Sequence, residues 1–185
     1  SDNELTDDMV RDIDDMNAIL DQFLAFIRDG SDEPMEECDL KELINAVVTP
    51  YNQQGHAIRL CLEEMPTLSL RRVSMKRMLA NLLENALRYG GQGVEVAACV
   101  VQGAQAPYVA ISVLDRGAGL NPEDLPRIFN PFIRGDEARG GQGTGLGLAI
   151  VQRIAAQHGA KVELHNRAGG GLEATVCLPI TTPAT

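Results

Sequence analysis

Residues 1–30 carry an apolar stripe that a single helix cannot bury, and this stripe limits what the chain can fold into. Its members recur at alternating intervals of four and three residues, the a/d pattern of a coiled coil: Met9, Ile13, Met16, Leu20, Phe23 and Ile27. Val10, Ile19 and Leu24 widen the stripe to the breadth typical of a four-helix bundle. We expect a helix that pairs with another copy of the chain or with a helix absent from it. Docking on the chain's own domain is the alternative.

The pattern changes after this helix. Gly30 and Pro34 break it, so residues 31–38 are predicted to be a linker and residues 39–185 a separate domain. Helical periodicity predicts helices at 40–53, 75–90 and 146–158, with Asp39 and Ser74 as N-caps, and a short helix near 123–128. Alternation predicts strands at 56–64, 67–71, 93–101, 108–115, 161–166 and 172–179. Together they predict an α+β fold, a two-layer sandwich of a mixed sheet with helices on one face.

Charge and composition exclude several classes of partner. The 185 residues carry a net charge of −10, which argues against a nucleic-acid surface or an anionic membrane surface. No apolar run approaches the ~18 residues of a membrane span. The four cysteines form no C-x-x-C pair and are expected to be reduced structural thiols. An acidic chain that binds a nucleotide needs its cations gathered at the site, or a divalent metal.

Two asparagines stand four residues apart on the predicted helix 75–90. Asn81 and Asn85 share one face, with Arg88 and Tyr89 one turn further on. Amide oxygens are neutral hard ligands that suit a Mg²⁺ whose remaining charge is met by phosphates. Arg88 could meet a phosphate and Tyr89 could cover a base. Taken alone, such a pair is more often a solvated surface.

A carboxylate ends the apolar strand 108–115. Asp115 is followed by Gly117 and Gly119, which permit a sharp turn of the backbone. A carboxylate at such a place can accept a hydrogen bond from an exocyclic amine such as that of adenine. A simple turn with an Asx cap would have the same sequence.

A long polar loop leads into a glycine-rich segment, "GGQGTGLGLAIVQ", at residues 140–152. Phe129 and Phe132 lie in this loop, which suggests that it docks onto something, and Arg134 and Arg139 precede the glycines. Glycines that lead into a helix favour a phosphate, because free N–H groups and the helix dipole both attract an anion. The segment is neither a Walker A loop nor a dinucleotide fingerprint.

The order of these motifs is more specific than any one of them. An N-x-x-x-N helix, a strand ending in D-x-G-x-G, an F-x-x-F loop and G-x-G-x-G-L before a helix resemble the N, G1, F and G2 boxes of histidine-kinase ATP-binding domains. Those domains share a superfamily with gyrase, Hsp90 and MutL. "LRYG", "PFIRGDEAR" and "GTGLGLAIVQRI" also resemble the osmosensor kinases of the EnvZ type, and the first helix resembles the end of their dimerisation hairpin.

The resemblance implies a Bergerat-type ATP site. Asp115 would bind the adenine amino group, Asn85 would hold Mg²⁺ with help from Asn81 and Gln142, and three arginines would approach phosphates. It implies a lid at about 117–143 and catalytic roles for Asn85, Arg88 and Arg134. Gly145 is expected to serve phosphate access and lid movement, so that Gly145→Ala weakens ATP binding with little loss of thermal stability. The full set implied to contact ATP is Asn81, Asn85, Arg88, Tyr89, Asp115, Gly117, Gly119, Arg134, Arg139, Gln142, Gly143, Thr144, Gly145, Leu146 and Gly147.

Two departures from the family pattern matter. Leu172 stands where the last glycine box usually has Ser or Thr, so we leave that box out of the site. None of the three histidines (His56, His158 and His165) is followed by an acid on a heptad helix, so all three are expected to be structural. The phosphoacceptor would then lie on a helix absent from this chain, which would bind Mg·ATP without phosphorylating itself.

The resemblance also implies partners and two alternatives. In the full protein we expect a homodimer through the helical hairpin, a response regulator as phosphoryl acceptor, and a cytoplasmic place in a bacterial inner-membrane sensor. Membrane contact would come through segments absent here, and no nucleic acid is expected. Another ATPase of the superfamily would need a catalytic Glu four residues before Asn85, where Asn81 stands. Glu84 lies on the same predicted helix, but only one residue before Asn85. A dimerisation module with a decayed nucleotide site is the other alternative.

Overall fold

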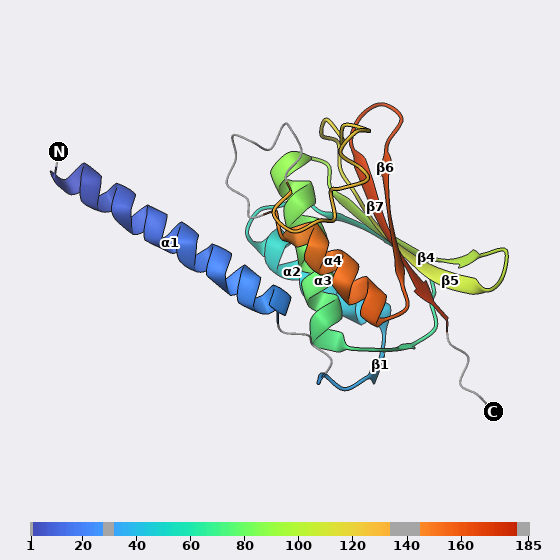
Figure 1. The fold of residues 1–185 in the computed structure, drawn as a ribbon. Coiled ribbons are helices and arrows are strands. Elements are labelled where there is room, and N and C mark those ends of the chain that lie inside the picture. The colour runs from blue at the N-terminus through green and yellow to red at the C-terminus, as the bar shows by residue number, and fades with distance from the viewer. Residues whose placement is uncertain (1, 28–31, 134–144, 181–185) are drawn as a thin grey trace.

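The computed structural model describes residues 2–27, 32–133 and 145–180. Helix α1 (Asp2–Ile27) projects away from a two-layer domain (Figure 1). All nine apolar side chains of its predicted stripe are at least 36% exposed, so the helix does not bury them on its own domain. The ring of Phe23 on α1 contacts the ring of Phe132 of the domain, with ring centroids 6.2 Å apart. No helix in the described ranges is both long and apolar enough to span a bilayer.

A mixed five-stranded sheet forms one layer of the domain, in the order β2-β4-β5-β7-β6. The first pair is parallel and the other three are antiparallel. Alternation along each strand directs one row of side chains to the core, as Val109, Ile111 and Val113 show in the central strand. The strands are β2 (Arg59–Leu62), β4 (Glu95–Gln102), β5 (Pro107–Leu114), β6 (Lys161–Asn166) and β7 (Leu172–Pro179).

Helices form the second layer, on one face of this sheet (Figure 1). They are α2 (Leu40–Gln53), α3 (Arg72–Tyr89) and α4 (Gly147–Gln157). Apolar residues at helical spacing turn inward, so that Ile44, Met78 and Ile150 are almost fully buried against the strands. The predicted α+β class with helices on one face of a mixed sheet is confirmed.

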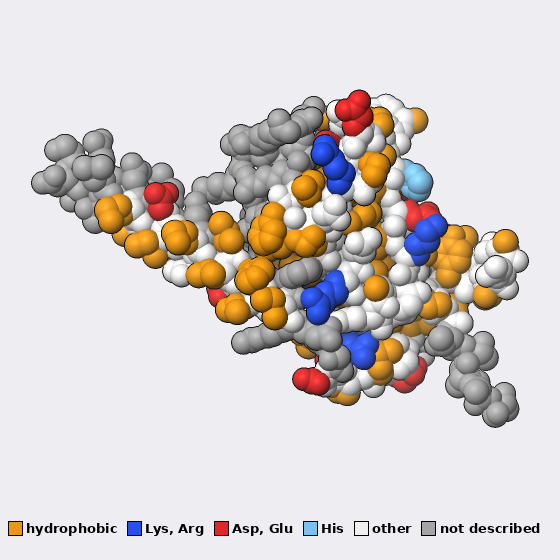
Figure 2. Space-filling view, in the orientation of Figure 1, with side chains coloured by type: hydrophobic (Ala, Val, Ile, Leu, Met, Phe, Trp, Pro, Cys, Tyr) orange, Lys and Arg blue, Asp and Glu red, His pale blue; other side chains and the backbone are white. Residues whose placement is uncertain are grey.

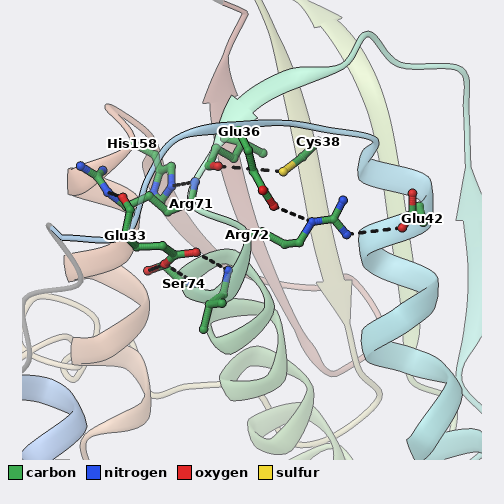
Figure 3. A network of polar contacts seen from close by, with 10 residues as sticks. Glu33, Glu36, Cys38, Glu42, Arg71, Arg72, Ser74 and His158 are labelled. Atoms are coloured by element: carbon green, nitrogen blue, oxygen red, sulfur yellow. Dashed lines mark hydrogen bonds and ion pairs between the residues drawn. The ribbon is translucent and has the colours of Figure 1, made fainter.

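A second, two-stranded sheet joins β1 (Glu36–Cys38) to β3 (Leu68–Leu70). The sequence does not predict β1, which falls in the segment expected to be a linker. Arg72, the first residue of α3, forms ion pairs with Glu36 of β1 at 2.8 Å and with Glu42 of α2 at 3.4 Å (Figure 3). The segment before α2 is therefore tied to the start of α3.

Two of the predicted local features are wrong and one is confirmed. Asp39 caps α2 as expected, since its Oδ1 accepts hydrogen bonds from the backbone N–H groups of Lys41 and Glu42. Ser74 is not an N-cap, because α3 begins two residues earlier at Arg72. The short helix expected near 123–128 is a run of turns whose backbone hydrogen bonds span three residues, such as Arg127 N–H to Asp124 O at 3.0 Å.

Candidate functional site

The amides of Asn81 and Asn85 lie directly beneath the N-terminus of α4. A methyl group on Gly147, the first residue of α4, would stand 3.4 Å from Asn81 Oδ1 and 3.6 Å from the Nδ2 and Oδ1 atoms of Asn85. Asn81 Nδ2 donates to Arg77 O at 2.9 Å, which orients its Oδ1 toward Gly147. The alternative for this motif was a solvated surface pair. In the structure the pair is instead half-buried between the two helices.

Asp115 is a buried carboxylate, 5% exposed, at the end of β5. Its Oδ1 accepts hydrogen bonds from the backbone N–H groups of Gly117 at 2.9 Å and Leu172 at 3.0 Å. Within the described part of the chain no hydrogen bond reaches its Oδ2. The bond to Gly117 is the Asx turn that was the alternative interpretation, and it leaves one oxygen of the carboxylate available as an acceptor.

Glycines allow Asp115 to approach the C-terminal end of α3. A Cβ on Gly90, which follows α3, would stand 2.2 Å from Asp115 Cβ, and one on Gly117 would stand 2.3 Å from Tyr89 O. Gly119 has a φ of +81°, in the left-handed region that favours glycine. The strand end and the helix end are thus in direct contact, which brings Asp115 to the same half of α3 as the asparagines.

Arg88 and Tyr89 occupy the last turn of α3 and both are exposed. Their side chains stand at the end of the helix that carries Asn81 and Asn85, one turn beyond Asn85. Leu146, which precedes α4, is fully buried. The remaining residues implied by the resemblance, Arg134, Arg139, Gln142, Gly143 and Thr144, lie outside the described residues.

Gly145 has a packing role that the sequence did not indicate. Its φ is +68°, its carbonyl accepts the N–H of Phe132 at 3.0 Å, and a Cβ on it would stand 2.9 Å from the Phe132 backbone. The expectation that Gly145→Ala leaves stability unchanged is therefore wrong, because the alanine would be strained and would clash with backbone. Phe129 packs against the core, whereas Phe132 is 58% exposed and has a left-handed φ of +65°.

Several groups around Asp115 escaped sequence analysis. Leu172, at the position of the last glycine box, donates its N–H to Asp115 Oδ1, and its carbonyl accepts the Asp115 N–H at 2.9 Å. Arg167 donates to Asp115 O at 2.6 Å, and a Cβ on Gly171 would stand 2.1 Å from that oxygen. The run of glycines at 169–171, all with positive φ, was the available signal. The box excluded from the site thus contacts it through backbone, whatever the Leu172 side chain does.

The structure also places the groups expected to stand outside the site. His158 is buried at the C-terminal end of α4 as its C-cap residue, where its Nε2 accepts the Arg71 N–H at 3.0 Å and its Nδ1 lies 2.7 Å from Ile154 O. It is a structural histidine, as predicted. The Thr175 hydroxyl forms a hydrogen bond with Ser112 Oγ at 2.7 Å. This threonine therefore does not take over the role of the Ser or Thr that the family pattern has where Leu172 stands. Among the described residues no three His, Cys, Asp or Glu side chains form a metal cluster.

Two kinds of recognition are combined along the second half of α3. The α4 N-terminus and the neighbouring amide oxygens suit phosphate together with a hard cation. The Asp115 carboxylate suits a hydrogen-bond donor such as an amino group, because its free oxygen is anionic and its position is fixed by backbone donors. A ligand with an amino-bearing ring at one end and phosphates at the other matches both.

Comparison with known proteins gives one family and several sensor kinases. The family described as histidine kinase-, DNA gyrase B-, and HSP90-like ATPase matches residues 71–182. Sensor histidine kinase GtrS of Pseudomonas aeruginosa is 34% identical over 181 residues, which are 96% of this chain and 36% of that protein. A probable sensor histidine kinase of Mycobacterium tuberculosis is 32% identical over 173 residues, 91% of this chain and 44% of that protein. The chain thus spans less than half of these relatives.

Solved structures agree with this match. The histidine kinase domain of the Escherichia coli osmosensor EnvZ superposes with a TM-score of 0.63 at 34% identity, over 84% of this chain and 95% of that domain. Full-length ShkA in complex with AMPPNP gives a TM-score of 0.74 at 25% identity, over 100% of this chain and 41% of ShkA. The first of these is the type of kinase that the sequence motifs resemble.

Proposed function

Because the chain belongs to the histidine kinase-, DNA gyrase B- and HSP90-like ATPase family, we propose that it is the catalytic ATP-binding part of a sensor histidine kinase. It would position Mg·ATP so that the γ-phosphoryl group passes to a histidine on another helix, for relay to an aspartate of a response regulator. One observation carries this proposal. The Asn81 and Asn85 amides lie under Gly147, and the buried Asp115 carboxylate lies beside the C-terminal end of the helix that bears these asparagines.

Each described residue has a defined task in this proposal. Asp115 Oδ2 accepts a hydrogen bond from the adenine amino group, while Oδ1 stays fixed by the Gly117 and Leu172 N–H groups. The α4 N-terminus provides backbone dipole for the phosphates, and Gly147 leaves room for them beside the amides. Arg88 meets phosphate oxygens and Tyr89 flanks the base. Arg134 and Arg139 are proposed to add further positive charge there.

The amide pair is suited to hold Mg²⁺. Asn85 and Asn81 would supply hard neutral oxygens, and Gln142 is proposed as a third. When bound, the ion would neutralise the charge on the phosphates during transfer. The chain's own contribution is to orient the nucleotide, which is where catalysis of phosphoryl transfer mainly lies.

The alternative of a hydrolase of the same family is less well supported. Glu84 directs its carboxylate to α2, where it accepts the Tyr51 hydroxyl at 3.3 Å. Burial and the neighbouring Glu84 charge raise the pKa of Tyr51 to about 12, so its phenol remains a donor. Glu84 therefore points away from the α4 side of the helix, and Asn81 occupies the position where a hydrolase has its base.

The proposal extends to the whole protein as follows. The exposed α1 stripe would pair within a helical hairpin and join two copies of the protein, and a response regulator would take the phosphoryl group. This domain would lie in the cytoplasm of a bacterium, as part of a membrane sensor. Without a phosphoacceptor histidine beside an acid, this chain would bind ATP but would not phosphorylate itself.

Calorimetry with a non-hydrolysable ATP analogue and Mg²⁺ tests the proposal. Asn85→Ala should weaken binding at least tenfold by a rough estimate, since one metal ligand is worth more than about 1.4 kcal/mol. Asp115→Asn should also weaken it, because the amide keeps the Oδ1 acceptor but replaces Oδ2 by a donor. Glu84→Ala, on the same helix but facing α2, is the matched control and should bind normally. A chain that binds no analogue, or variants that bind as the unsubstituted chain does, would support the decayed module instead.

A further inference from the structure

The segment after α1 is fastened to the N-terminus of α3 by Glu33 (Figure 3). Its carboxylate accepts the backbone N–H of Val73, the N–H of Ser74 at 3.0 Å and the Ser74 hydroxyl at 2.6 Å. The residue at the N-cap position, Arg71, makes no side-chain cap. The first N–H groups of α3 are thus satisfied by a residue about forty positions earlier in the chain.

Arg71 extends this contact to the C-terminus of α4 (Figure 3). Its Nε donates to Glu33 O at 3.1 Å and its Nη1 donates to Gln157 O at 3.2 Å. Its backbone N–H donates to His158 Nε2 at 3.0 Å, and the His158 ring lies against Ile154 O. We call this group of Glu33, Arg71, Ser74 and His158 the Glu33 junction. It joins three separate segments: the stretch after α1, the start of α3 and the end of α4.

The same two helices meet again at the candidate site. α3 and α4 run antiparallel, because the start of α3 contacts the end of α4 while Asn81 and Asn85 contact Gly147 at the start of α4. At a rise of 1.5 Å per residue, Asn81 lies about 15 Å along α3 from Arg71. A displacement of either helix at the junction would therefore change how Gly147 lies over the asparagines.

We propose that Glu33 is a positioning residue of the nucleotide site, acting through α3 and α4. By joining the stretch after α1 to the start of α3 directly, and to the end of α4 through Arg71, it fixes the α4 N-terminus over Asn81 and Asn85 and makes nucleotide affinity depend on where that stretch lies. This proposal rests on the proposed ATP site. A cap within α3 itself would stabilise the helix equally well; the cap from Glu33 also couples the helix to a distant segment. Because coupling is reciprocal, nucleotide binding must in turn hold the stretch more firmly.

The first test compares two acids in the same segment. Glu33→Ala should weaken analogue binding by about two- to thirtyfold, the range found when a residue of a coupling network is removed. Glu33→Gln keeps one carbonyl acceptor, so its affinity for the analogue should lie between those of Glu33→Ala and the unsubstituted chain. Asp32→Ala removes the same charge from the neighbouring exposed residue and should leave affinity unchanged. Calorimetry on the whole chain with the analogue and Mg²⁺ measures all four.

A relocated cap separates positioning from simple stabilisation. Arg71 has extended backbone angles (φ −82°, ψ 101°) that are close to those of the capping residue Asp39 (φ −78°, ψ 114°), so they suit an N-cap aspartate. In Glu33→Ala/Arg71→Asp the new carboxylate should cap α3 and restore the melting temperature. Affinity should stay low, because neither the Glu33 carboxylate nor the Arg71 guanidinium then joins residue 33 to the ends of α3 and α4. Hydrogen exchange adds a second measurement: the analogue should slow exchange of the Val73 and Ser74 amides in the unsubstituted chain and not in the double variant.

The outcomes are distinguishable. Affinity that recovers together with the melting temperature in the double variant would show that Glu33 is merely a cap. Equal weakening by Asp32→Ala would show that charge alone matters, and unchanged amide exchange in the unsubstituted chain would show no coupling. Each would overturn this proposal while leaving the ATP site intact. A chain that binds no analogue at all would overturn the proposed function, and this inference with it.

Discussion

At the scale of single residues, the Glu33 carboxylate makes hydrogen bonds that depend on pH. Burial alone would raise the pKa of Glu33, but hydrogen bonds from the Ser74 hydroxyl and from the Val73 and Ser74 N–H groups outweigh burial. The pKa of Glu33 therefore lies below its ordinary value of 4.5. A carboxylate with a lowered pKa stabilises the folded state only while it is ionised.

We predict that the stabilisation by Glu33 is complete well above pH 4.5 and is lost as the pH falls through the lower folded-state pKa. The measurement is the free energy of unfolding in urea, for the unsubstituted chain and for Glu33→Gln, from about pH 6 to about pH 3. Because glutamine does not titrate, the difference between the two should shrink toward acid. Arg71, which donates to the main-chain carbonyl of residue 33, and His158 are the same in both chains. A difference that grows toward acid would contradict the assigned sign.

Residues whose role depends on distant partners were the ones that sequence could not predict. Asn81, Asn85 and Asp115 could be proposed as site residues from sequence because each belongs to a local motif with a chemical meaning. Gly90 and Gly171 were missed, since they are required by the approach of segments far apart in the chain. Ser74 was assigned as a cap on local grounds, whereas the true cap comes from Glu33, about forty residues away.

At the scale of elements, the antiparallel pair α3 and α4 determines the shape of the site. Gly147 opens α4 without a positive φ, so alanine fits its backbone there and favours the helix by up to about 1 kcal/mol. The added methyl group would fill the space above the Asn81 and Asn85 amides.

We predict that Gly147→Ala weakens analogue binding roughly tenfold, equivalent to about 1.4 kcal/mol, while the melting temperature stays the same or rises. Gly145→Ala, two residues earlier, should lower the melting temperature as well, because its φ is +68° and its Cβ would meet the Phe132 backbone. Calorimetry and thermal unfolding on both variants give the comparison. If Gly147→Ala bound the analogue normally, the α4 N-terminus would not be part of the nucleotide site.

Elements with a strong period were predicted from sequence, and elements without one were not. The helices 40–53 and 146–158 and the strands at the centre of the sheet were found within a few residues, because burial of one face imposes a regular pattern. β1 has three residues in an acidic stretch and owes its existence to pairing with β3. The expected helix near 123–128 has helix-forming residues, but proline at 122 and 126 favours turns instead.

At the scale of the whole molecule, an exposed apolar stripe extends along α1 (Figure 2). The chain has a net charge of −10, which opposes association through the rest of its surface. An apolar stripe of this kind on an otherwise acidic protein favours pairing with another helix.

We predict that the chain associates with itself through α1 at high concentration, and that Leu20→Asp on the stripe reduces this association. Ala18→Asp adds the same charge on the opposite side of the helix and should leave association unchanged. Light scattering over a concentration series measures the effect, and thermal unfolding should show that the domain is equally stable in both. Association that survives Leu20→Asp would mean that another surface is responsible.

The length of α1 has a mechanical consequence for anything attached to its far end. Its 26 residues extend over about 39 Å, so a rotation of ten degrees about its C-terminal end would sweep the N-terminal end through about 7 Å. Phe23 stands one turn from that end and would move by about 1 Å, little enough to keep its ring beside Phe132. The helix is a lever with a long outer arm and a short inner one. In such a rotation it would convert a wide movement at its N-terminal end into a displacement beside the domain that is several times smaller.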